Sequence, residues 1–266
     1  MKDLLRPILN PIALKLMRLG FDPRAILSYR YYPLYRKQRK EWLSLGGKIT
    51  QNYMILADYA DSAGIAKGHY FHQDLLVSNF IFENNPKRHV DVGSRVDGFV
   101  AHVASFRKIE VIDIRTLPKS EHENIQFKQA DLMNPQDIGE TESLSCLHVI
   151  EHFGLGRYTD KIDVDGHLKG IENLVSLVKS GGRFYISFPI GMENEVHFNA
   201  HRVFHPQSIF SIPSIADNMT LVRFDYVDDN GDLHLDVAVE DAVGKNKYGC
   251  GIYTFERLTA HKCKHE

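Results

Sequence analysis

Residues 89–98 read HVDVGSRVDG, and the interpretation of the chain starts from this stretch. Val90 and Val92 flank Asp91 in an apolar run typical of a buried strand, and Gly93 precedes the helix-favouring run FVAHVASF. A glycine has no Cβ, so it lets a ligand approach the backbone, and the N-terminus of the following helix favours an anion. The stretch therefore predicts a strand, a tight turn and a helix that form a nucleotide-type cofactor site.

A second acid supports this interpretation. Asp113 ends the strand-like run IEVIDI twenty residues after Gly93, close to the spacing at which such folds place a carboxylate against a ribose. Further along, strand-like and helix-like runs alternate in SLSCLHVI, GHLKGIENLVSLVK and RFYISFPI. This alternation predicts βαβ units and a doubly wound, mainly parallel sheet. Two β-rich runs around Asn230 and Gly231 predict a terminal antiparallel pair.

The length of 266 residues suits one elaborated α/β domain with an extension. Residues 1–60 are predicted to form a basic helical N-terminal extension, with helices over 3–19 and 33–45. Residues 61–266 are predicted to form the main domain, which starts with a helix over 68–84.

Charge separates these two parts. Residues 1–40 hold ten Lys or Arg against two Asp, a net charge of +8, while residues 41–266 carry a net charge of −10. Tyrosines interleave the basic residues, which suits an anionic membrane surface or a phosphorylated substrate. The alternative is an amphipathic helical extension that packs on the acidic main domain.

The N-terminal sequence and the cysteine content both favour a cytoplasmic location. The first 21 residues are broken by charges and prolines, so they form neither a clean signal-peptide core nor a membrane span. Three cysteines without a CxxC pair favour a reducing compartment. We therefore expect a cytoplasmic protein, with residues 1–40 as its contact to the inner face of the membrane.

Several runs, in their order along the chain, resemble the successive motifs of class I S-adenosylmethionine-dependent methyltransferases. They are HVDVGSRVDGF, IEVIDIR, FKQADL, SCLHVIEHFGLGRYTD and LVKSGGRFYISFP. Most similar is a methyltransferase-like family of unknown function associated with bacterial surface-polysaccharide genes, whose signatures include DVGSR-DGF, LSCLHVIEHFGLGRY and FNAHRVF. The resemblance covers residues 68–255 and implies S-adenosylmethionine as cofactor. It also implies an α/β, Rossmann-like fold with a seven-stranded, mainly parallel sheet and a terminal antiparallel strand.

The resemblance further implies which residues hold this cofactor. Asp91, Gly93 and Ser94 would surround its amino-acid end, and Asp113 would accept hydrogen bonds from the ribose hydroxyls. A ribose diol presents two donors, which one carboxylate can accept together. The other implied contacts are Arg95 in the glycine loop, Ile114 on the adenine, Asp131 and Leu132 at the adenine edge and face, and His148 below the cofactor.

Each acid also has a purely structural interpretation. Asp91 could cap the following helix, Asp113 could end its strand in a turn, and Asp131 could be solvated. The loop also departs from the usual GxGxG pattern, because Arg95 replaces the glycine that normally allows close approach to the cofactor. The Arg95 guanidinium is therefore expected to point away from the cofactor or to bind its carboxylate.

Glu151 and His152 follow the run SLSCLHVI directly, at the carboxyl edge of the predicted sheet, where α/β folds bind ligands. Methyl transfer to a hydroxyl is an in-line displacement that needs an aligned acceptor and a base. His152 is predicted to be this base, because imidazole titrates near neutrality, and Glu151 is predicted to orient it or to contact the cofactor amino group. Alternatively, both side chains bond only to loop backbone.

Two further polar sets lie in loops expected after the fourth and fifth strands. A guanidinium fork binds anions and a tyrosine ring stacks on the apolar face of a sugar, so these sets suit a sugar or phosphate; a structural network between two loops is the alternative. The acid-rich residues 160–167 lack the spacing of a calcium loop and Asp165 is expected to cap a helix, so no metal is predicted. The predicted substrate-binding residues are Arg157, Tyr158, Asn199, His201 and Arg202.

We therefore expect a methyltransferase that methylates an oxygen of a sugar or glycan intermediate in surface-polysaccharide biosynthesis. The alternative is a non-catalytic methyltransferase-like module that binds a glycan or a partner enzyme at the membrane surface. Nucleic acid is not expected as a partner, because the basic residues are confined to one end of an otherwise acidic chain. The missing GxGxxG pattern disfavours an NAD-dependent oxidoreductase.

Overall fold

The computed structural model describes residues 23–259, and the chain divides into two compact units, Met1–Ile65 and Ala66–Glu266. The helix predicted over 3–19 lies outside the described residues. Among the helices that are described, none combines the length and the apolar character needed to cross a membrane.

The described part of the first unit, residues 23–65, contains the α-helices α2 (Pro23–Ser28) and α3 (Tyr32–Ser44), so the helix predicted over 33–45 is confirmed. Gly46 has a φ of 85°, a conformation that favours glycine and that ends a helix. The same residues also contain two short 3-10 turns, η1 (Tyr29–Tyr31) and η2 (Ala57–Ala60).

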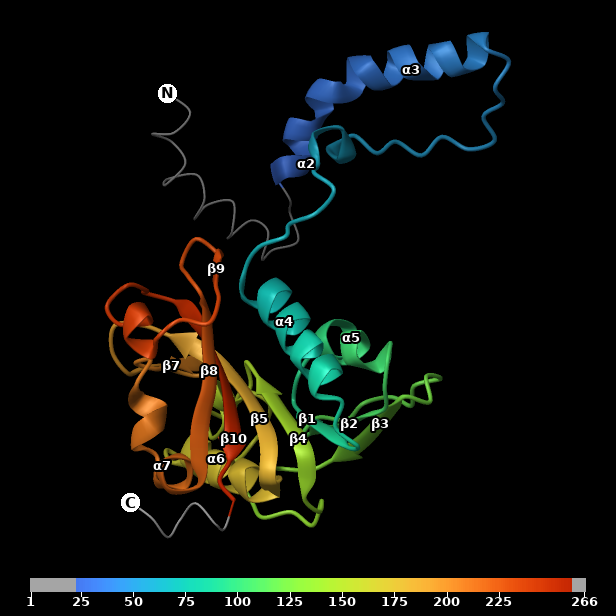
Figure 1. The fold of residues 1–266 in the computed structure, drawn as a ribbon. Coiled ribbons are helices and arrows are strands. Elements are labelled where there is room, and N and C mark those ends of the chain that lie inside the picture. The colour runs from blue at the N-terminus through green and yellow to red at the C-terminus, as the bar shows by residue number, and fades with distance from the viewer. Residues whose placement is uncertain (1–22, 260–266) are drawn as a thin grey trace. The chain divides into compact units, whose positions relative to one another are not determined.

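The second unit is built on an eight-stranded sheet in the order β3-β2-β1-β4-β5-β10-β8-β9 (Figure 1). Strands β1 to β5 are parallel to one another, whereas β10 runs antiparallel to both β5 and β8. The strands of this sheet are β1 (His89–Val92), β2 (Ile109–Asp113), β3 (Ile125–Gln129), β4 (Thr141–Leu147), β5 (Val178–Ile190), β8 (Met219–Val227), β9 (Leu233–His234) and β10 (Gly249–Arg257).

Helices cover both faces of this sheet (Figure 1). Helix α4 (His69–Asn84) and the short α5 (Ala101–Ala104) pack on one face, and α6 (Gly166–Leu177) packs on the other. Successive side chains of a strand point to opposite faces, and β5 accordingly directs Phe184 to the α6 core and Tyr185 to the α4 core. Both apolar layers are buried, so the predicted doubly wound, mainly parallel architecture is confirmed.

The elements outside the sheet core are small. Strands β6 (Glu195–His197) and β7 (His201–Val203) form a separate antiparallel ribbon after β5. The remaining elements are the π-turn η3 (Val96–Val100), the 3-10 turns η4 (Ile150–His152), η5 (Ser208–Ser211) and η6 (Val239–Ala242), and helix α7 (Pro213–Asn218).

The last strand of the chain, β10, is antiparallel as predicted, and it lies between β5 and β8. Two details differ from the prediction. The sheet has eight strands instead of seven, because β9 pairs with β8 beyond the turn at Gly231. Finally, no helix connects β2, β3 and β4 within the described chain. The β2–β3 connection contains Pro118 and lacks a helical apolar period, so it has no face to bury.

Candidate functional site

The loop after β1 turns at Gly93, which has a φ of 71°. The Gly93 amide donates to the Ile112 carbonyl at 2.8 Å, so the loop stays attached to β2. A Cβ on this residue would lie 2.5 Å from Cγ1 of Val149, which is closer than side-chain atoms can approach. Glycine is therefore required here both by its backbone conformation and by the close approach of the loop after β4.

Asp91 lies beneath this loop and is completely buried. Its carboxylate accepts hydrogen bonds from the Ser94 amide at 3.1 Å, the Ser94 hydroxyl at 2.7 Å and the Ser145 hydroxyl at 2.6 Å. Burial raises the pKa of Asp91 to about 7, although the hydrogen bonds from Ser145 and Ser94 oppose the shift. Asp91 and Ser94 thus hold the loop in shape from below.

A pocket opens above this loop, at the carboxyl ends of β1, β2 and β4 and beside the segment after β3. This is the edge at which parallel α/β sheets bind ligands, and β1 and β4 are the neighbouring strands from which the chain proceeds in opposite directions. Many of the residues predicted for cofactor or catalysis line this one pocket. They are Gly93, Asp113, Ile114, Asp131, Leu132, His148, His152 and Tyr158.

Asp113 ends β2 and faces the pocket with a side chain that is 13% exposed. Its carboxylate accepts hydrogen bonds from the Arg115 amide at 2.8 Å and from Nη2 of Arg115 at 2.5 Å. The Arg115 guanidinium also lies 4.5 Å from the ring centroid of Tyr158, an arrangement typical of a cation–π contact. Sequence reasoning missed Arg115, although its place two residues after Asp113 is visible in the run IDIR.

Asp131 follows β3 and shapes the opposite wall. Its Oδ1 accepts a hydrogen bond from the Met133 amide at 2.9 Å, and its Oδ2 accepts one from Nδ2 of Asn134 at 2.8 Å. The carboxylate thus closes a local turn that presents Leu132 and Met133, both largely buried, to the pocket. Carboxylates at two ends and apolar side chains between them give the pocket an amphipathic lining.

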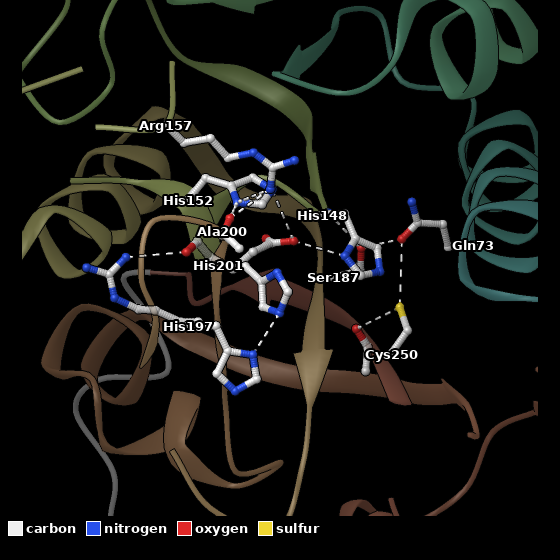
Figure 2. A network of polar contacts seen from close by, with 12 residues as sticks. Gln73, His148, His152, Arg157, Ser187, His197, Ala200, His201 and Cys250 are labelled. Carbon is white, nitrogen blue, oxygen red and sulfur yellow. Dashed lines mark hydrogen bonds and ion pairs between the residues drawn. The ribbon is translucent and has the colours of Figure 1, made fainter. Parts of the chain in front are cut away.

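His148 follows β4 directly and has a φ of 54°, an uncommon conformation for a residue with a side chain. Its Nδ1 lies 2.9 Å from Oε1 of Glu151, and both side chains are almost fully buried. Burial alone would lower the pKa of His148, but the neighbouring Cys250 and Glu151 outweigh it and raise the pKa well above its usual value. The backbone amide of His148 donates to the Ser187 hydroxyl at 3.2 Å, and this hydroxyl and the Cys250 thiol both contact Oε1 of Gln73 (Figure 2).

His152 lies in η4, and its ring reaches the pocket. Its Nδ1 lies 2.8 Å from the Ala200 carbonyl, and because a carbonyl only accepts, Nδ1 carries the proton. Burial, with Arg157 nearby, lowers the pKa of His152 despite the opposing charge of Glu151. Near neutral pH the ring is therefore uncharged, and its Nε2 carries a lone pair that can accept a proton, with Nη1 of Arg157 3.4 Å away.

Arg157 supports His152 and does not line the pocket itself. Its Nη1 donates to the Ala200 carbonyl at 2.7 Å, so the guanidinium and the His152 ring share one acceptor (Figure 2). The guanidinium also lies 5.3 Å from the ring centroid of Tyr158. Arg115 and Arg157 thus place two positive charges beside the Tyr158 ring, at the rim of the pocket.

The other predicted substrate residues lie outside this pocket. Arg202 is buried and its Nη1 donates to the Phe153 carbonyl at 2.6 Å, so it joins two loops as the structural alternative expects. His201 begins β7, where its Nε2 lies 3.2 Å from Nδ1 of His197, and Asn199 is exposed between β6 and β7. None of these three residues lines this pocket, and Arg202 lines a separate one.

Arg95 also lies outside the pocket. Its guanidinium forms hydrogen bonds of 2.9 and 3.1 Å with the exposed Asp97 carboxylate, and its side chain is 62% exposed. The first of the two orientations considered for Arg95, away from the cofactor position, is therefore the one adopted. The departure from the GxGxG pattern leaves the pocket entrance unobstructed by this side chain.

Asp160, in the acid-rich segment 160–167, also lines the pocket. Its Oδ2 accepts hydrogen bonds from the Gly154 amide at 3.0 Å and the Gly156 amide at 3.2 Å, so it holds the loop that carries Tyr158. Its neighbours along 160–167 have similar local roles: Asp163 pairs with Lys169 at 2.5 Å. Asp165 takes the N-cap position of α6, but its side chain makes no capping hydrogen bond, contrary to expectation.

The comparisons with known proteins bear on the fold. A family model described as "Caenorhabditis protein of unknown function, DUF268" matches residues 127–234, less than half of the chain. No curated protein matches the sequence.

Solved structures are similar in fold at low identity. The [4+2]-cyclase SpnF is 12% identical with a TM-score of 0.50, over 74% of this chain and 89% of the other. The N-methyltransferase NodS from Bradyrhizobium japonicum WM9, in complex with S-adenosyl-L-homocysteine, is 11% identical with a TM-score of 0.49, over 72% and 89%. An S-adenosylmethionine-dependent methyltransferase from Clostridium acetobutylicum ATCC 824 is 12% identical with a TM-score of 0.49, over 85% and 100%. The likeness to SpnF, at 12% identity, describes a shared architecture only.

Proposed function

We propose that this chain is a cytoplasmic S-adenosylmethionine-dependent methyltransferase whose acceptor is an oxygen of a sugar or glycan, in the biosynthesis of a surface polysaccharide. The observation that carries the proposal is the convergence of the Asp113 and Asp131 carboxylates with the His152 imidazole in one pocket. These groups come from three separate segments, after β2, β3 and β4, and only the fold brings them together.

The lining of the pocket fits this cofactor. Gly93 lines the pocket without a side chain, and Asp113 presents a carboxylate at the strand end, where ribose hydroxyls can donate to it in place of Arg115. Ile114, Leu132 and Met133 offer the apolar surface that an adenine ring requires. When bound, S-adenosylmethionine supplies an electrophilic methyl group on a sulfonium.

The residues of this chain would then act on the acceptor. His152 is neutral near pH 7, with its proton on Nδ1, so its Nε2 can accept the proton of an acceptor hydroxyl as the oxygen attacks. The Ala200 carbonyl fixes the tautomer, and Glu151, whose Oε1 lies 3.7 Å from Nε2, stabilises the imidazolium that forms.

The rim of the pocket supports a sugar that carries a negative charge. The Tyr158 ring can stack on the apolar face of a pyranose, and the guanidinium groups of Arg115 and Arg157 flank that ring. Phosphate or carboxylate on the acceptor would pair with these cations. A sugar nucleotide, a lipid-linked sugar or an acidic polymer therefore suits this rim better than a neutral monosaccharide.

Calorimetry of the full chain with S-adenosylmethionine and S-adenosylhomocysteine tests the cofactor. We expect binding, and Asp113→Asn should weaken it about 10- to 100-fold, since a hydrogen bond to a charged group contributes about 1.5–3 kcal/mol. Asp97→Asn is the matched control, because Asp97 is exposed and does not line the pocket. Absence of binding by the folded wild-type chain would remove the proposal. Incubation with labelled cofactor and charged or neutral sugar acceptors tests the proposed acceptor, and we expect methylation of a charged sugar.

The second candidate is a non-catalytic module that binds a glycan or a partner enzyme at a membrane surface, and helix α3 favours it. This helix exposes Trp42 and Leu43 to 56% and 45% beside a row of basic residues. Aromatic, leucine and basic side chains on one helix suit the interface of an anionic membrane. The basic residues of this row are Arg36, Lys37, Arg39 and Lys40.

Sedimentation with vesicles of anionic or neutral lipid separates this candidate from a purely soluble enzyme. We expect salt-sensitive binding to anionic vesicles. A variant in which alanine replaces all four basic residues Arg36, Lys37, Arg39 and Lys40 of α3 should lose this binding. A control variant removes the same amount of charge from exposed lysines elsewhere. Equal binding by both variants would contradict a membrane role for α3. The control replaces Lys119, Lys161, Lys245 and Lys247 with alanine.

A further inference from the structure

Three side chains that could bind a metal ion lie close together in the fold: His69, His148 and Cys250. His69 is the first residue of α4, His148 follows β4, and Cys250 is the second residue of β10. One ligand atom from each of these side chains lies within 4.8 Å of the other two. All three belong to the unit Ala66–Glu266, and they are far apart in sequence, so the fold alone assembles them.

The His148 ring has one nitrogen without a partner. Its side chain is 4% exposed, its Nδ1 bonds to Oε1 of Glu151 at 2.9 Å, and its buried Nε2 has no hydrogen-bond partner. A buried polar atom without a partner is costly and needs an explanation. Metal-binding histidines commonly have this arrangement, in which one ring nitrogen bonds to a carboxylate and the other binds the ion.

The other two ligands suit the same ion. Cys250 is fully buried, and its Sγ has only long contacts of 3.8 Å, to Oε1 of Gln73 and to the Gly251 carbonyl. The His69 ring is half-buried and stacks between His148 at 5.3 Å and Tyr248 at 5.6 Å. Rotation of this more accessible ring would bring its nitrogen closer to the other two ligand atoms, as bonds of about 2.0–2.3 Å to one ion require.

We propose that His69, His148 and Cys250 form a zinc site, with Glu151 orienting His148. One thiolate and two imidazoles are the ligand types that zinc prefers, and three protein ligands leave a fourth position for water or an exchangeable ligand. Binding replaces the S–H bond of Cys250 by a sulfur–zinc bond and releases the proton to solvent. The ion would connect α4, β4 and β10.

This site shares His148 and Glu151 with the pocket, but the two proposals can be tested separately. The zinc site does not require S-adenosylmethionine, and the cofactor proposal does not require zinc, so each can fail alone. Metal binding is measured without cofactor, and cofactor binding is measured in the presence of a chelator.

The experiment uses the full chain, purified, stripped of metal and titrated with Zn²⁺ in competition with a chromogenic chelator. We expect one tightly bound ion per chain, and at least a tenfold loss of affinity in both His69→Ala and Cys250→Ser. Cys146→Ser is the matched control for the thiol, because Cys146 is equally buried but lies outside the cluster. His72→Ala, on the same helix as His69, is the control for the imidazole and should bind as the wild type does.

Substitution with Co²⁺ gives a second, spectroscopic readout that detects the metal–thiolate bond itself. A cobalt–thiolate bond produces an intense charge-transfer absorption in the near ultraviolet, so the wild-type chain should show this band and folded Cys250→Ser should not. Circular dichroism establishes the folding of each variant. A wild-type chain that binds no zinc, or that binds cobalt without the thiolate band, would overturn the site.

Discussion

The pocket above Gly93 and the His69–His148–Cys250 cluster differ in how the chain assembles them. The pocket takes its residues from consecutive strand ends, β1 to β4, and each residue falls in a short motif. The cluster takes one residue from the start of α4, one after β4 and one from β10. A site made from strand ends in chain order can be recognised from sequence, whereas a site made from distant elements becomes visible only in the fold.

The two regions also differ in how their polar groups are satisfied. In the pocket, the carboxylates of Asp113 and Asp131 already accept hydrogen bonds from neighbouring groups of the chain. In the cluster, Nε2 of His148 is buried without a partner. Polar groups at a solvated edge can exchange partners at small cost, but a buried unpaired nitrogen favours one specific ligand.

The largest expected effect concerns the pocket alone. His152→Ala should lower the rate of methyl transfer about 10²–10⁴-fold, because general-base catalysis contributes this much, while cofactor affinity changes little. His122→Ala, in the exposed β2–β3 loop, is the control. The rate is measured with labelled cofactor and the best acceptor, and zinc content is measured in parallel. If the variant retained the wild-type rate, His152 would not be the base.

The second prediction concerns pH and Asp91. The pKa of this acid is about 7 in the folded protein, above its ordinary value of 3.8, so the folded state retains a proton that the unfolded chain releases. The free energy of unfolding should therefore decrease as the pH rises through this window, by about 1.4 kcal/mol per pH unit, and level off above about pH 7. Asp91→Asn should remove this decrease.

Urea denaturation of the wild type and of Asp91→Asn, at about pH 5 and about pH 7.5, measures the effect. The difference between the two proteins separates Asp91 from His89, whose pKa burial lowers to about 3 and whose contribution has the opposite sign. Parallel pH profiles of the two proteins would show that Asp91 is ionised in the fold at both pH values.

The smallest expected effect is on cofactor affinity, and it concerns Arg95 in the loop after β1. Arg95→Ala should change cofactor affinity less than about twofold, because its guanidinium pairs with Asp97 at the surface and exposed ion pairs contribute about 0–1 kcal/mol. Calorimetry with S-adenosylhomocysteine is sufficient. A tenfold loss would mean that Arg95 turns into the pocket when ligand binds.

Sequence reasoning succeeded where local pattern was strong. The helical apolar spacing over 68–84 predicted α4 within one residue, and the runs HVDV and IEVIDI correspond to β1 and β2. Sequence reasoning was less successful where the pairing of strands or the packing of loops determines the structure. The two residues of β9 form a strand only because they pair with Tyr226 and Val227 of β8. Likewise, the loop FNAHRVF suggested substrate contacts, but tertiary packing turned Arg202 to the backbone carbonyl of Phe153.

What the sequence determined by itself is the alternation of strands and helices, the turn at Gly93 and the set of polar residues at the strand ends. These features depend on backbone propensity and on the period of apolar residues, which act over a few neighbouring residues. Only the tertiary structure decided which polar groups meet. It brought Cys250 and His69 to His148, and it brought Asp113 and Asp131 into one pocket with His152. Such contacts join residues far apart in the chain, so they depend on the packing of the whole sheet and its helices.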